Sequence, residues 1–293
     1  MIENLSIIIP ALNEEESIPI LLDEIENEIE NLNINYEIIL VDDGSDKYLK
    51  DYIKKRKNIT VLRNNSPKGQ TFSIEMGIRE SNFNHVCLMD GDGQNPPSEI
   101  KKLISLYNQH QIDVASGIRL DRKDGSNRKY ISKFANYLVR KITKTKSQDI
   151  GCSLKIFDKK IVDDVDFTGD IHRILVTLLE MRGYKIKQIN IEHKKREKGQ
   201  TSYSYNRTLP VLIDAFLLNL TNGFVRTPRY ALGKLSFYFL FGSIVSFVIS
   251  LVQKLSLDVY VHRNPIFLIG ITLFFVSIQL FVFSVSTVSN NRK

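Results

Sequence analysis

Short apolar runs alternate with longer amphipathic segments through the first 110 residues of the chain. Each run is four or five residues long and is closed by proline or a charged residue, which is typical of strands buried on both faces of a sheet. The runs predict strands at residues 6–10, 37–41, 59–62 and 85–89. The segments between them predict helices at residues 47–57, 66–80 and 97–108, besides one after the first strand. This alternation predicts a doubly wound, mostly parallel α/β sheet that binds ligands beyond the carboxyl ends of its strands.

The first helix has the clearest signals. Asn13 is a candidate N-cap, and glutamates at residues 14–16 fill the turn where the helix dipole favours acids. Five apolar side chains then recur at helical spacing, namely Ile18, Leu21, Leu22, Ile25 and Ile29. We therefore expect a helix that starts directly after Asn13 and packs one apolar stripe against the sheet.

The alternation weakens beyond residue 115. Ten lysines and arginines lie between residues 119 and 146, and a second basic patch covers residues 193–199. Between the two patches, residues 178–191 predict the end of a helix, a stop at Gly183 and a further strand. The patches are either solvated surface or anion-binding sites, and charge alone does not distinguish the two.

Two long uncharged segments follow near the end of the chain. Residues 235–253 and 266–289 each come close to or exceed the roughly 20 residues that a bilayer core requires. They predict a hairpin of two transmembrane helices joined by residues 254–265, with a pair of buried core helices as the alternative. Basic residues before the first span and after the second place both ends in the cytoplasm, although Lys254 and Arg263 in the loop weaken the contrast.

This pattern divides the chain into three parts. We expect a cytosolic α/β domain at residues 1–207, a juxtamembrane region with an interfacial helix at residues 208–229, and a transmembrane hairpin at residues 230–293. The chain does not open with the basic region of a signal peptide, so we expect the first domain to remain in the cytosol. The protein is accordingly predicted in the inner or plasma membrane.

Composition narrows the classes of function. The 293 residues have a formal net charge of +7, which favours anionic partners. The two cysteines, Cys87 and Cys152, give a disulfide framework little support. The glycine-rich fingerprints of dinucleotide-binding folds and P-loop enzymes are missing from the sequence, which argues against both classes. The basic residues lack interleaved aromatic side chains, so no nucleic acid is expected as a partner.

Two acidic clusters follow strands at the same predicted edge of the sheet. Asp42 and Asp43 follow the second strand, and Asp90-Gly91-Asp92 follows the fourth. The glycine lets both neighbouring carboxylates turn toward one hard cation, and carboxylate oxygens suit Mg²⁺ or Mn²⁺ completed by substrate phosphates. Asp-x-Asp pairs also cap ordinary turns, so the second cluster at the same edge is what favours a metal site.

Three motifs, in this order and spacing, resemble the family 2 glycosyltransferases with a GT-A (Rossmann-like) fold. They are residues 8–15 (IIPALNEE), 41–45 (VDDGS) and 89–97 (MDGDGQNPP). Residues 149–152, residues 172–173, the patch at residues 196–203 and the terminal hairpin are similar to the polyprenyl-phosphate glycosyltransferases. That group includes dolichol-phosphate mannose synthase and bacterial undecaprenyl-phosphate sugar transferases. The resemblance covers nearly the whole chain.

The resemblance implies an inverting, metal-dependent hexosyltransferase of the EC 2.4.1 type. It would move a sugar from a UDP- or GDP-sugar to undecaprenyl or dolichyl phosphate at the cytosolic face of a lipid bilayer, with Mg²⁺ or Mn²⁺ as cofactor. The implied nucleotide-binding residues are Pro10, Leu12, Asn13, Glu14, Asp42, Asp43 and Asp90. The implied metal ligands are Asp90 and Asp92. The implied catalytic residues are Asp90, Asp92, Gln94, Arg119 and Arg128.

The resemblance also implies an acceptor-phosphate site. Its residues would be Arg119, Arg128, His172, Arg173, Arg196, Lys198 and Tyr203. Neither Arg119 nor Arg128 belongs to an apolar periodic pattern that would bury its stem. We therefore expect both arginines on a flexible surface loop, acting on phosphate rather than on folding.

Two positions depart from the family pattern. Ser202 stands where the family often has lysine, so a phosphate contact is either lost or supplied by Lys198. Gly93 and Asn95 flank Gln94 where Leu and Asp or His are commoner, which predicts a looser metal loop.

Other functions compete with this one. Processive polysaccharide synthases share the GT-A motifs but resemble one another in a Gln-x-x-Arg-Trp motif, and this chain has no tryptophan. A transferase for another lipid or glycan acceptor, and a non-catalytic nucleotide-sugar-binding adaptor, stay as alternatives. Intact Asp42, Asp90, Asp92 and Arg119 argue against the adaptor. The motifs do not encode the sugar, the nucleotide, the polyprenol or the oligomeric state, for which a homo-oligomer is one alternative.

Overall fold

The computed structural model describes residues 1–53, 56–109, 111–119, 140–141, 143, 145–194, 228–257, 260 and 263–290. The chain forms two compact units, Met1–Phe216 and Leu217–Lys293. Four predicted site residues lie outside the described residues, namely Arg128, Arg196, Lys198 and Tyr203. The predicted interfacial helix at residues 209–220 also lies outside them.

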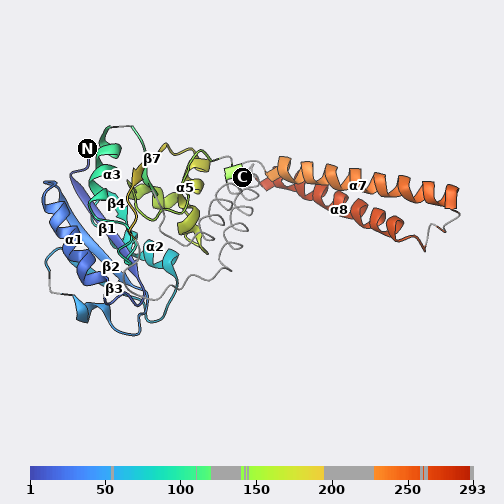
Figure 1. Cartoon of the computed structure of the whole chain (residues 1–293). Coiled ribbons are helices and arrows are strands. Elements are labelled where there is room, and N and C mark those ends of the chain that lie inside the picture. Colours follow the sequence, from blue (N-terminus) through green and yellow to red (C-terminus); the bar gives the residue numbers. More distant parts are fainter. Residues whose placement is uncertain are drawn as a thin grey trace. The chain divides into compact units, whose positions relative to one another are not determined.

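A sheet of seven strands forms the middle of the first unit, counted within the described ranges (Figure 1). The strands are β1 (Asn4–Ala11), β2 (Asn35–Asp42), β3 (Ile59–Arg63), β4 (His85–Leu88), β5 (Val114–Arg119), β6 (Lys155–Asp158) and β7 (Ile186–Ile191). Their spatial order is β3-β2-β1-β4-β6-β5-β7. Neighbouring strands run parallel except at β6, which is antiparallel to both β4 and β5. The predicted mostly parallel sheet is confirmed, with one reversed strand inserted between β4 and β5.

Helices cover both faces of this sheet. The main apolar core joins it to α1 (Ile18–Glu30) and α3 (Glu99–Gln109), while α2 (Gln70–Glu80) packs on the other face beside α5 (Ile171–Arg182). The predicted apolar stripe of α1 is buried along its whole length. Burial of each such aliphatic side chain contributes about 1.5–3 kcal/mol. On the other face, Gly77 gives α2 its close approach, because a Cβ there would lie 2.5 Å from Ile8 Cγ2.

The predicted start of α1 is wrong. The helix begins at Ile18, and Asn13 instead adopts the left-handed region with φ +56°. Its backbone N–H donates to Ser45 Oγ at 2.9 Å, and its side-chain oxygen accepts from the Asp46 N–H at 2.9 Å. These contacts tie the loop after β1 to the loop after β2. They compete with helix formation, which a local capping pattern does not reveal.

The predicted helix at residues 47–57 is also wrong. Among the described residues of this segment, 47–53 and 56–57, the structure has a short 3₁₀ turn, η1 (Leu49–Tyr52), in place of the helix. Its Leu49 N–H donates to Asp42 Oδ2 at 3.3 Å. The helix predicted from residue 66 begins at Gln70, because Asp43 accepts from the N–H groups of Lys68 and Gly69 just before it. In both places a buried aspartate organises the loop.

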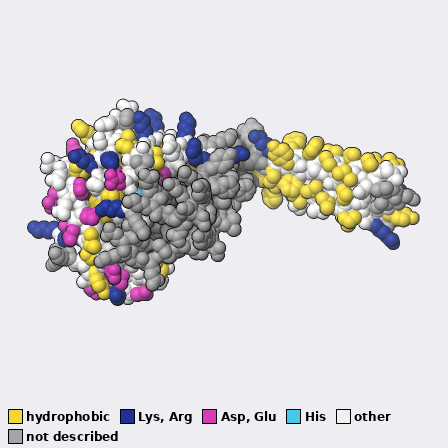
Figure 2. Space-filling model, viewed as in Figure 1, with side chains coloured by type: hydrophobic (Ala, Val, Ile, Leu, Met, Phe, Trp, Pro, Cys, Tyr) yellow, Lys and Arg dark blue, Asp and Glu magenta, His cyan; other side chains and the backbone are white. Residues whose placement is uncertain are grey.

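The second unit is a pair of long helices, α7 (Pro228–Leu257) and α8 (Pro265–Asn290). Within them Leu232–Ser256 and Pro265–Ser286 are long and apolar enough to cross a membrane, with mean hydropathies of 2.2 and 2.6. Most of each segment is exposed, which contradicts the alternative of core helices. Figure 2 shows hydrophobic side chains along these helices, whereas charged side chains are spread over the first unit. Length and composition therefore agree with the predicted membrane hairpin.

Candidate active site

The carboxyl ends of three adjacent strands bring the N-terminal motifs together. Strand β1 lies between β2 and β4, and all three are parallel, so their ends meet at one edge of the sheet. Pro10 pairs with Val41 near this edge, and Ala11 pairs with Asp42. Asp90 follows the end of β4. The motifs therefore lie where open α/β sheets bind their ligands.

Asp42 and Asp43 are buried and held by donors of the protein itself. Asp42 accepts from the Ser45 N–H at 2.8 Å and forms an ion pair with Arg63 at 2.6 Å. Asp43 accepts from Asn64 Nδ2 at 2.7 Å and from two backbone N–H groups before α2. Both carboxylates thus shape the edge loops, and their predicted contact with a nucleotide stays a prediction. Sequence reasoning missed Arg63, which only its position at the end of β3 brings to Asp42.

The first turn of α2 connects two of the predicted groups. Gln70 Nε2 donates to Asp90 Oδ1 at 2.7 Å, and Thr71 Oγ1 lies 2.7 Å from His172 Nδ1. One helix end thus orients the Asp90 carboxylate and the His172 ring. Sequence reasoning missed Gln70 and Thr71, although Gly69, with φ +96°, marks the turn before them.

Three hydrogen bonds contact the loop that carries Asp92. Its Oδ1 accepts from the Gln94 N–H at 3.1 Å, and the Gln94 carbonyl accepts from the Lys194 N–H at 2.8 Å. Asn95 is buried and donates to Ser153 Oγ at 2.8 Å. Residues more than fifty positions away thus contact this loop, while the expectation that it is looser than in the family stays a prediction.

Asp90 and Asp92 fit a hard divalent cation that takes only a few of its ligands from the protein. Their oxygens are the donor type that Mg²⁺ and Mn²⁺ prefer, and Gln70 already orients one of the carboxylates. Within the described ranges, no group of three or more His, Cys, Asp or Glu side chains gathers around one point. The residues present therefore suit an ion held by one or two carboxylates plus substrate phosphates.

A small cavity of about 40 Å³ lies beside Asp90. Its lining includes Pro10, Gln70, Lys155, His172 and Arg173, from four different elements and their ends. The structure thus brings together four predicted site residues, Pro10, Asp90, His172 and Arg173, at one place.

Lys155 is the main residue that sequence reasoning missed in this cavity. It stands in β6, is only 2% exposed, and donates to the His172 carbonyl at 3.4 Å. Burial lowers the pKa of its ammonium group below the usual value for lysine. A single lysine among the apolar residues 154–157 was the available signal, because a charge at a buried strand position is costly without a role.

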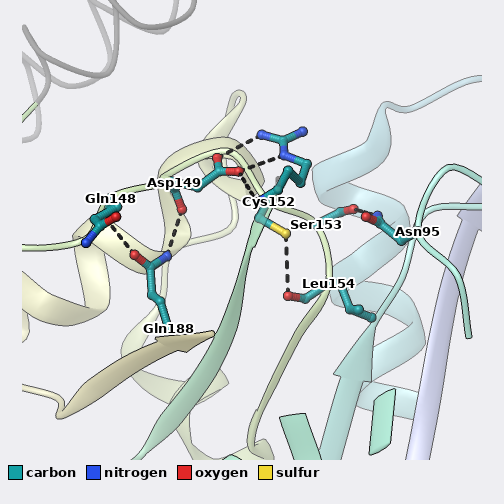
Figure 3. Close-up of polar contacts among 8 residues, drawn as sticks. Asn95, Gln148, Asp149, Cys152, Ser153, Leu154 and Gln188 are labelled. Atoms are coloured by element: carbon teal, nitrogen blue, oxygen red, sulfur yellow. Dashed lines mark hydrogen bonds and ion pairs between the residues drawn. The ribbon is translucent and has the colours of Figure 1, made fainter. Parts of the chain in front are cut away.

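Arg119 differs from its prediction. Its side chain is 11% exposed and forms a two-pronged ion pair with Asp149, with both Nε and Nη2 at 2.8 Å from carboxylate oxygens. Figure 3 shows Asp149 beside Gln188, whose side chain donates to the Asp149 carbonyl. The expectation of an exposed stem is wrong, since β5 carries Arg119 into the sheet edge. A Cβ on Gly151, which lines the cavity, would lie 3.4 Å from Arg119 Nη2.

The remaining predicted residues lie around the loop after β1 and at the start of α5. Leu12 is 43% exposed, while Glu14 is buried and accepts from Ser17 Oγ at 2.9 Å. Arg173 lies 3.5 Å from Asp170 at the start of α5. None of these contacts tests a role in binding, so the roles stay predictions.

The cysteines have no catalytic character. Both are unpaired and buried. Burial raises the pKa of the Cys152 thiol to about 11 and also raises that of Cys87. Neither thiol forms a nucleophilic thiolate near neutral pH.

A larger groove of about 630 Å³ lies at the opposite edge of the sheet, where β5 and β7 begin. Glu180, Tyr184 and Lys185 are among its lining residues, and no motif residue contributes to it. Its position at the amino ends of parallel strands argues against the reaction site.

Comparison with known proteins agrees with this geometry. Residues 6–166 match the family described as glycosyl transferase family 2. The chain is 30% identical over 291 residues to a dodecaprenyl-phosphate galacturonate synthase of Rhizobium johnstonii, covering 94% of this chain and 84% of that protein. It is 31% identical over 218 residues to an undecaprenyl-phosphate 4-deoxy-4-formamido-L-arabinose transferase of Pectobacterium carotovorum. That match covers 73% of this chain and 66% of the transferase.

A solved structure confirms the fold. Glucosyl-3-phosphoglycerate synthase from Mycobacterium tuberculosis, in complex with Mn²⁺, UDP-glucose and phosphoglyceric acid, superposes with a TM-score of 0.58 at 15% identity. The match covers 75% of this chain and 79% of that one. The predicted GT-A-like arrangement is therefore confirmed.

Proposed function

The chain belongs to glycosyl transferase family 2, and we propose that it transfers a sugar from a nucleoside-diphosphate sugar to a polyprenyl phosphate. The observation that carries this proposal is the cavity that Asp90, Lys155, His172 and Arg173 line together. A carboxylate suited to a divalent ion, near a lysine and an arginine, matches a reaction between two phosphate-bearing substrates. Relatives named for polyprenyl-phosphate sugar transfer, at about 30% identity, support the same acceptor class.

The acceptor phosphate is the nucleophile in this proposal. Its second pKa is about 6, so at neutral pH the phosphate is largely ionised and needs alignment more than a strong base. One phosphate oxygen attacks the anomeric carbon as the bond from that carbon to the diphosphate breaks, which inverts the configuration. His172 and Arg173 would align the attacking phosphate and offset its charge.

The departing diphosphate needs charge stabilisation. Asp90 and Asp92 would hold Mg²⁺ or Mn²⁺, which supplies positive charge to the diphosphate oxygens. Gln70 keeps the Asp90 carboxylate in one orientation. Pro10, Leu12, Asn13 and Glu14 would contact the nucleotide from the loop after β1, and Arg119 and Gln94 would complete the catalytic group.

The sugar donor is a separate part of the proposal. We predict a hexosyl donor carried by UDP or GDP, whereas the relatives named above act on a uronate and on a formamido-pentose. Purified full-length protein would be incubated with a panel of nucleotide sugars, undecaprenyl or dolichyl phosphate, and Mg²⁺ or Mn²⁺. A lipid-linked sugar detected by mass spectrometry identifies donor and acceptor together. Donor binding without any product would instead favour the non-catalytic adaptor.

The metal role has a sharper test. Asp92→Ala should lower the transfer rate about 100-fold or more, because stabilisation of the departing diphosphate is lost. Asp163→Ala removes an exposed aspartate of η2 (Lys159–Asp164) and serves as the matched control. Full activity of Asp92→Ala, or undiminished turnover in excess EDTA, would contradict the proposal.

We also propose the membrane arrangement. Residues 1–207 would form the cytosolic catalytic domain, residues 208–229 an interfacial region, and residues 230–293 a hairpin with both chain ends in the cytosol. Single cysteines at positions 260 and 290 should then react with an impermeant reagent from opposite sides. The native Cys87 and Cys152 are buried and give little background. Labelling from the same side would refute the hairpin.

A further inference from the structure

Lys155 holds a positive charge in an unusual place. It is among the largest fully buried side chains of the chain, and it stands in β6 opposite Leu88, two residues before Asp90. An ammonium group carries three hydrogen-bond donors. Within the described ranges, it makes one hydrogen bond, at 3.4 Å to the His172 carbonyl, and no ion pair within 4.0 Å.

Neither neighbouring carboxylate forms an ion pair with Lys155 among the described residues. Both Asp149 oxygens lie 2.8 Å from nitrogens of Arg119, and Asp90 Oδ1 accepts from Gln70. Asp90 and Asp149 act on the Lys155 charge only through space. A buried ammonium with so little compensation destabilises the protein unless an anion completes its surroundings.

The residues that line the cavity indicate which anion Lys155 would bind. Lys155 lines it together with Asp90, His172 and Arg173, at the edge of the sheet where substrate phosphates would meet. We propose that the Lys155 ammonium binds a phosphate oxygen of a substrate, an inference that rests on the proposed function. Two donors of this ammonium have no partner within the described ranges, and they would form short charge-assisted hydrogen bonds to that oxygen. Lysine binds phosphate in this way as a point charge.

Two substrates carry the chemistry that Lys155 would recognise. The donor has a diphosphate, and the acceptor has a terminal monophosphate. Inorganic pyrophosphate represents the first and farnesyl phosphate the second. Neither probe requires sugar transfer, so their binding is measured independently of the proposed reaction.

The test uses the full chain in lipid nanodiscs with Mg²⁺. Lys155→Met removes the charge and keeps an unbranched side chain, while Lys155→Gln keeps a donor for the His172 carbonyl. Lys160→Met, at an exposed lysine of η2, is the matched control. Loss of a charged hydrogen bond should weaken binding of one or both probes about tenfold to a hundredfold in both Lys155 variants. The control should bind like the parent.

The pattern of loss identifies the source of the phosphate. Weaker pyrophosphate binding assigns Lys155 to the donor, weaker farnesyl phosphate binding assigns it to the acceptor, and loss of both assigns it to a shared position. The melting temperature of Lys155→Met should equal or exceed that of the parent, because an uncompensated buried charge is removed.

Other results overturn the inference. Parental affinity for both probes in a folded Lys155→Met or Lys155→Gln variant would do so, and a lower melting temperature with unchanged affinities would show that Lys155 only supports α5. If the parent binds the probes through Lys155 but transfers no sugar, the proposed function fails and the phosphate site stands. If the parent transfers sugar and both variants keep parental affinities, the proposed function stands and the phosphate site at Lys155 is refuted.

Discussion

The two units of the chain bury opposite kinds of side chain. In the first unit, isoleucines and leucines of the sheet, α1 and α3 form the core, and most charged groups face outward. In α7 and α8, many phenylalanines, valines and isoleucines are exposed, while Ser236, Ser243, Ser250 and Ser277 are buried. Figure 2 shows the hydrophobic side chains along the surface of these helices. Water stabilises the first arrangement through the hydrophobic effect. A lipid environment removes that effect between helices, so packing and hydrogen bonds of small residues take its place.

The buried serines of the hairpin follow a regular spacing. Ser236, Ser243 and Ser250 recur every seven residues in α7, and Gly270, Ser277 and Ser284 do so in α8. Ser243 Oγ donates to the Gly270 carbonyl at 2.8 Å, and Ser236 Oγ donates to the Ser277 carbonyl at 2.9 Å. A seven-residue repeat keeps one seam between two helices. The hairpin therefore has a polar seam and an apolar exterior.

The largest effect should come from breaking a buried charge pair, which only the first unit contains among the described residues. Arg119→Ala leaves Asp149, 9% exposed, without its two-pronged partner. The free energy of unfolding should fall by about 3–5 kcal/mol. Arg182→Ala, at an exposed arginine, should change it by about 0.5 kcal/mol or less. Thermal unfolding followed by circular dichroism measures both. A parental melting temperature for Arg119→Ala would restore the surface role first expected from the sequence.

The second largest effect should come from placing an aspartate on the exposed surface of each unit. Ile278 in α8 and Ile20 in α1 are similarly exposed, at 43% and 50%. Ile278→Asp should oppose membrane insertion by about 2.5–3.5 kcal/mol, whereas Ile20→Asp should have an effect near zero because water already surrounds it. The membrane-bound fraction after carbonate washing measures the difference. Equal retention of both variants would show that the hairpin exterior does not face lipid.

The polar seam should show a smaller effect. Ser243→Ala removes the hydrogen bond to the Gly270 carbonyl and should weaken the association of α7 and α8 by about 0.6 kcal/mol, and by at most about 1.7 kcal/mol. The chain has no tryptophan, so Phe267→Trp beside Phe247 adds a single fluorescent reporter of helix separation in detergent titrations. Ser286→Ala, at an exposed serine of α8, is the control. Equal midpoints for both serine variants would exclude a stabilising seam.

Acid should destabilise the first unit and leave the helices α7 and α8 unchanged. Burial favours the neutral form of Glu37, but hydrogen bonds from Ser6 and Asn82 outweigh it and lower the pKa of this carboxyl below 4.5. A carboxyl whose pKa is lower in the folded state binds fewer protons there, so its contribution is present above about pH 4.5 and is lost as the pH falls through the folded-state pKa. The described parts of α7 and α8 contain no Asp or Glu.

Urea unfolding at several pH values between roughly 3 and 7 would measure the loss of the Glu37 contribution. This range brackets the titration of carboxyl groups. Glu37→Gln should reduce the dependence on pH in the first unit. The helical signal of the hairpin should stay constant over the same range. A parental slope in Glu37→Gln would assign the acid sensitivity to other carboxyls.

The elements with strong local patterns were predicted well. The stripe of α1, the strands β1 to β4 and the two apolar helices all follow periodicities that neighbouring residues define. The acidic motifs were correctly expected at one sheet edge, because the ends of parallel strands meet wherever the alternation of strands and helices holds. The errors at Asn13 and at residues 47–57 arose where side chains of another loop compete with a local helix signal.

The sequence by itself determined the class of sheet, the pair of long apolar helices and the motifs that mark the family, since each depends on residue type and short-range spacing. Tertiary structure alone decided that β6 enters the sheet reversed, that Arg119 pairs with Asp149, that Gln70 orients Asp90, and that Lys155 lines the same cavity as His172. The residue pairs named here are separated by 17 to 30 residues in the sequence. The place of β6 depends on the order of strands in the sheet. Their energies come from burial and from geometry between distant segments, and no local pattern records which distant segment a side chain will meet.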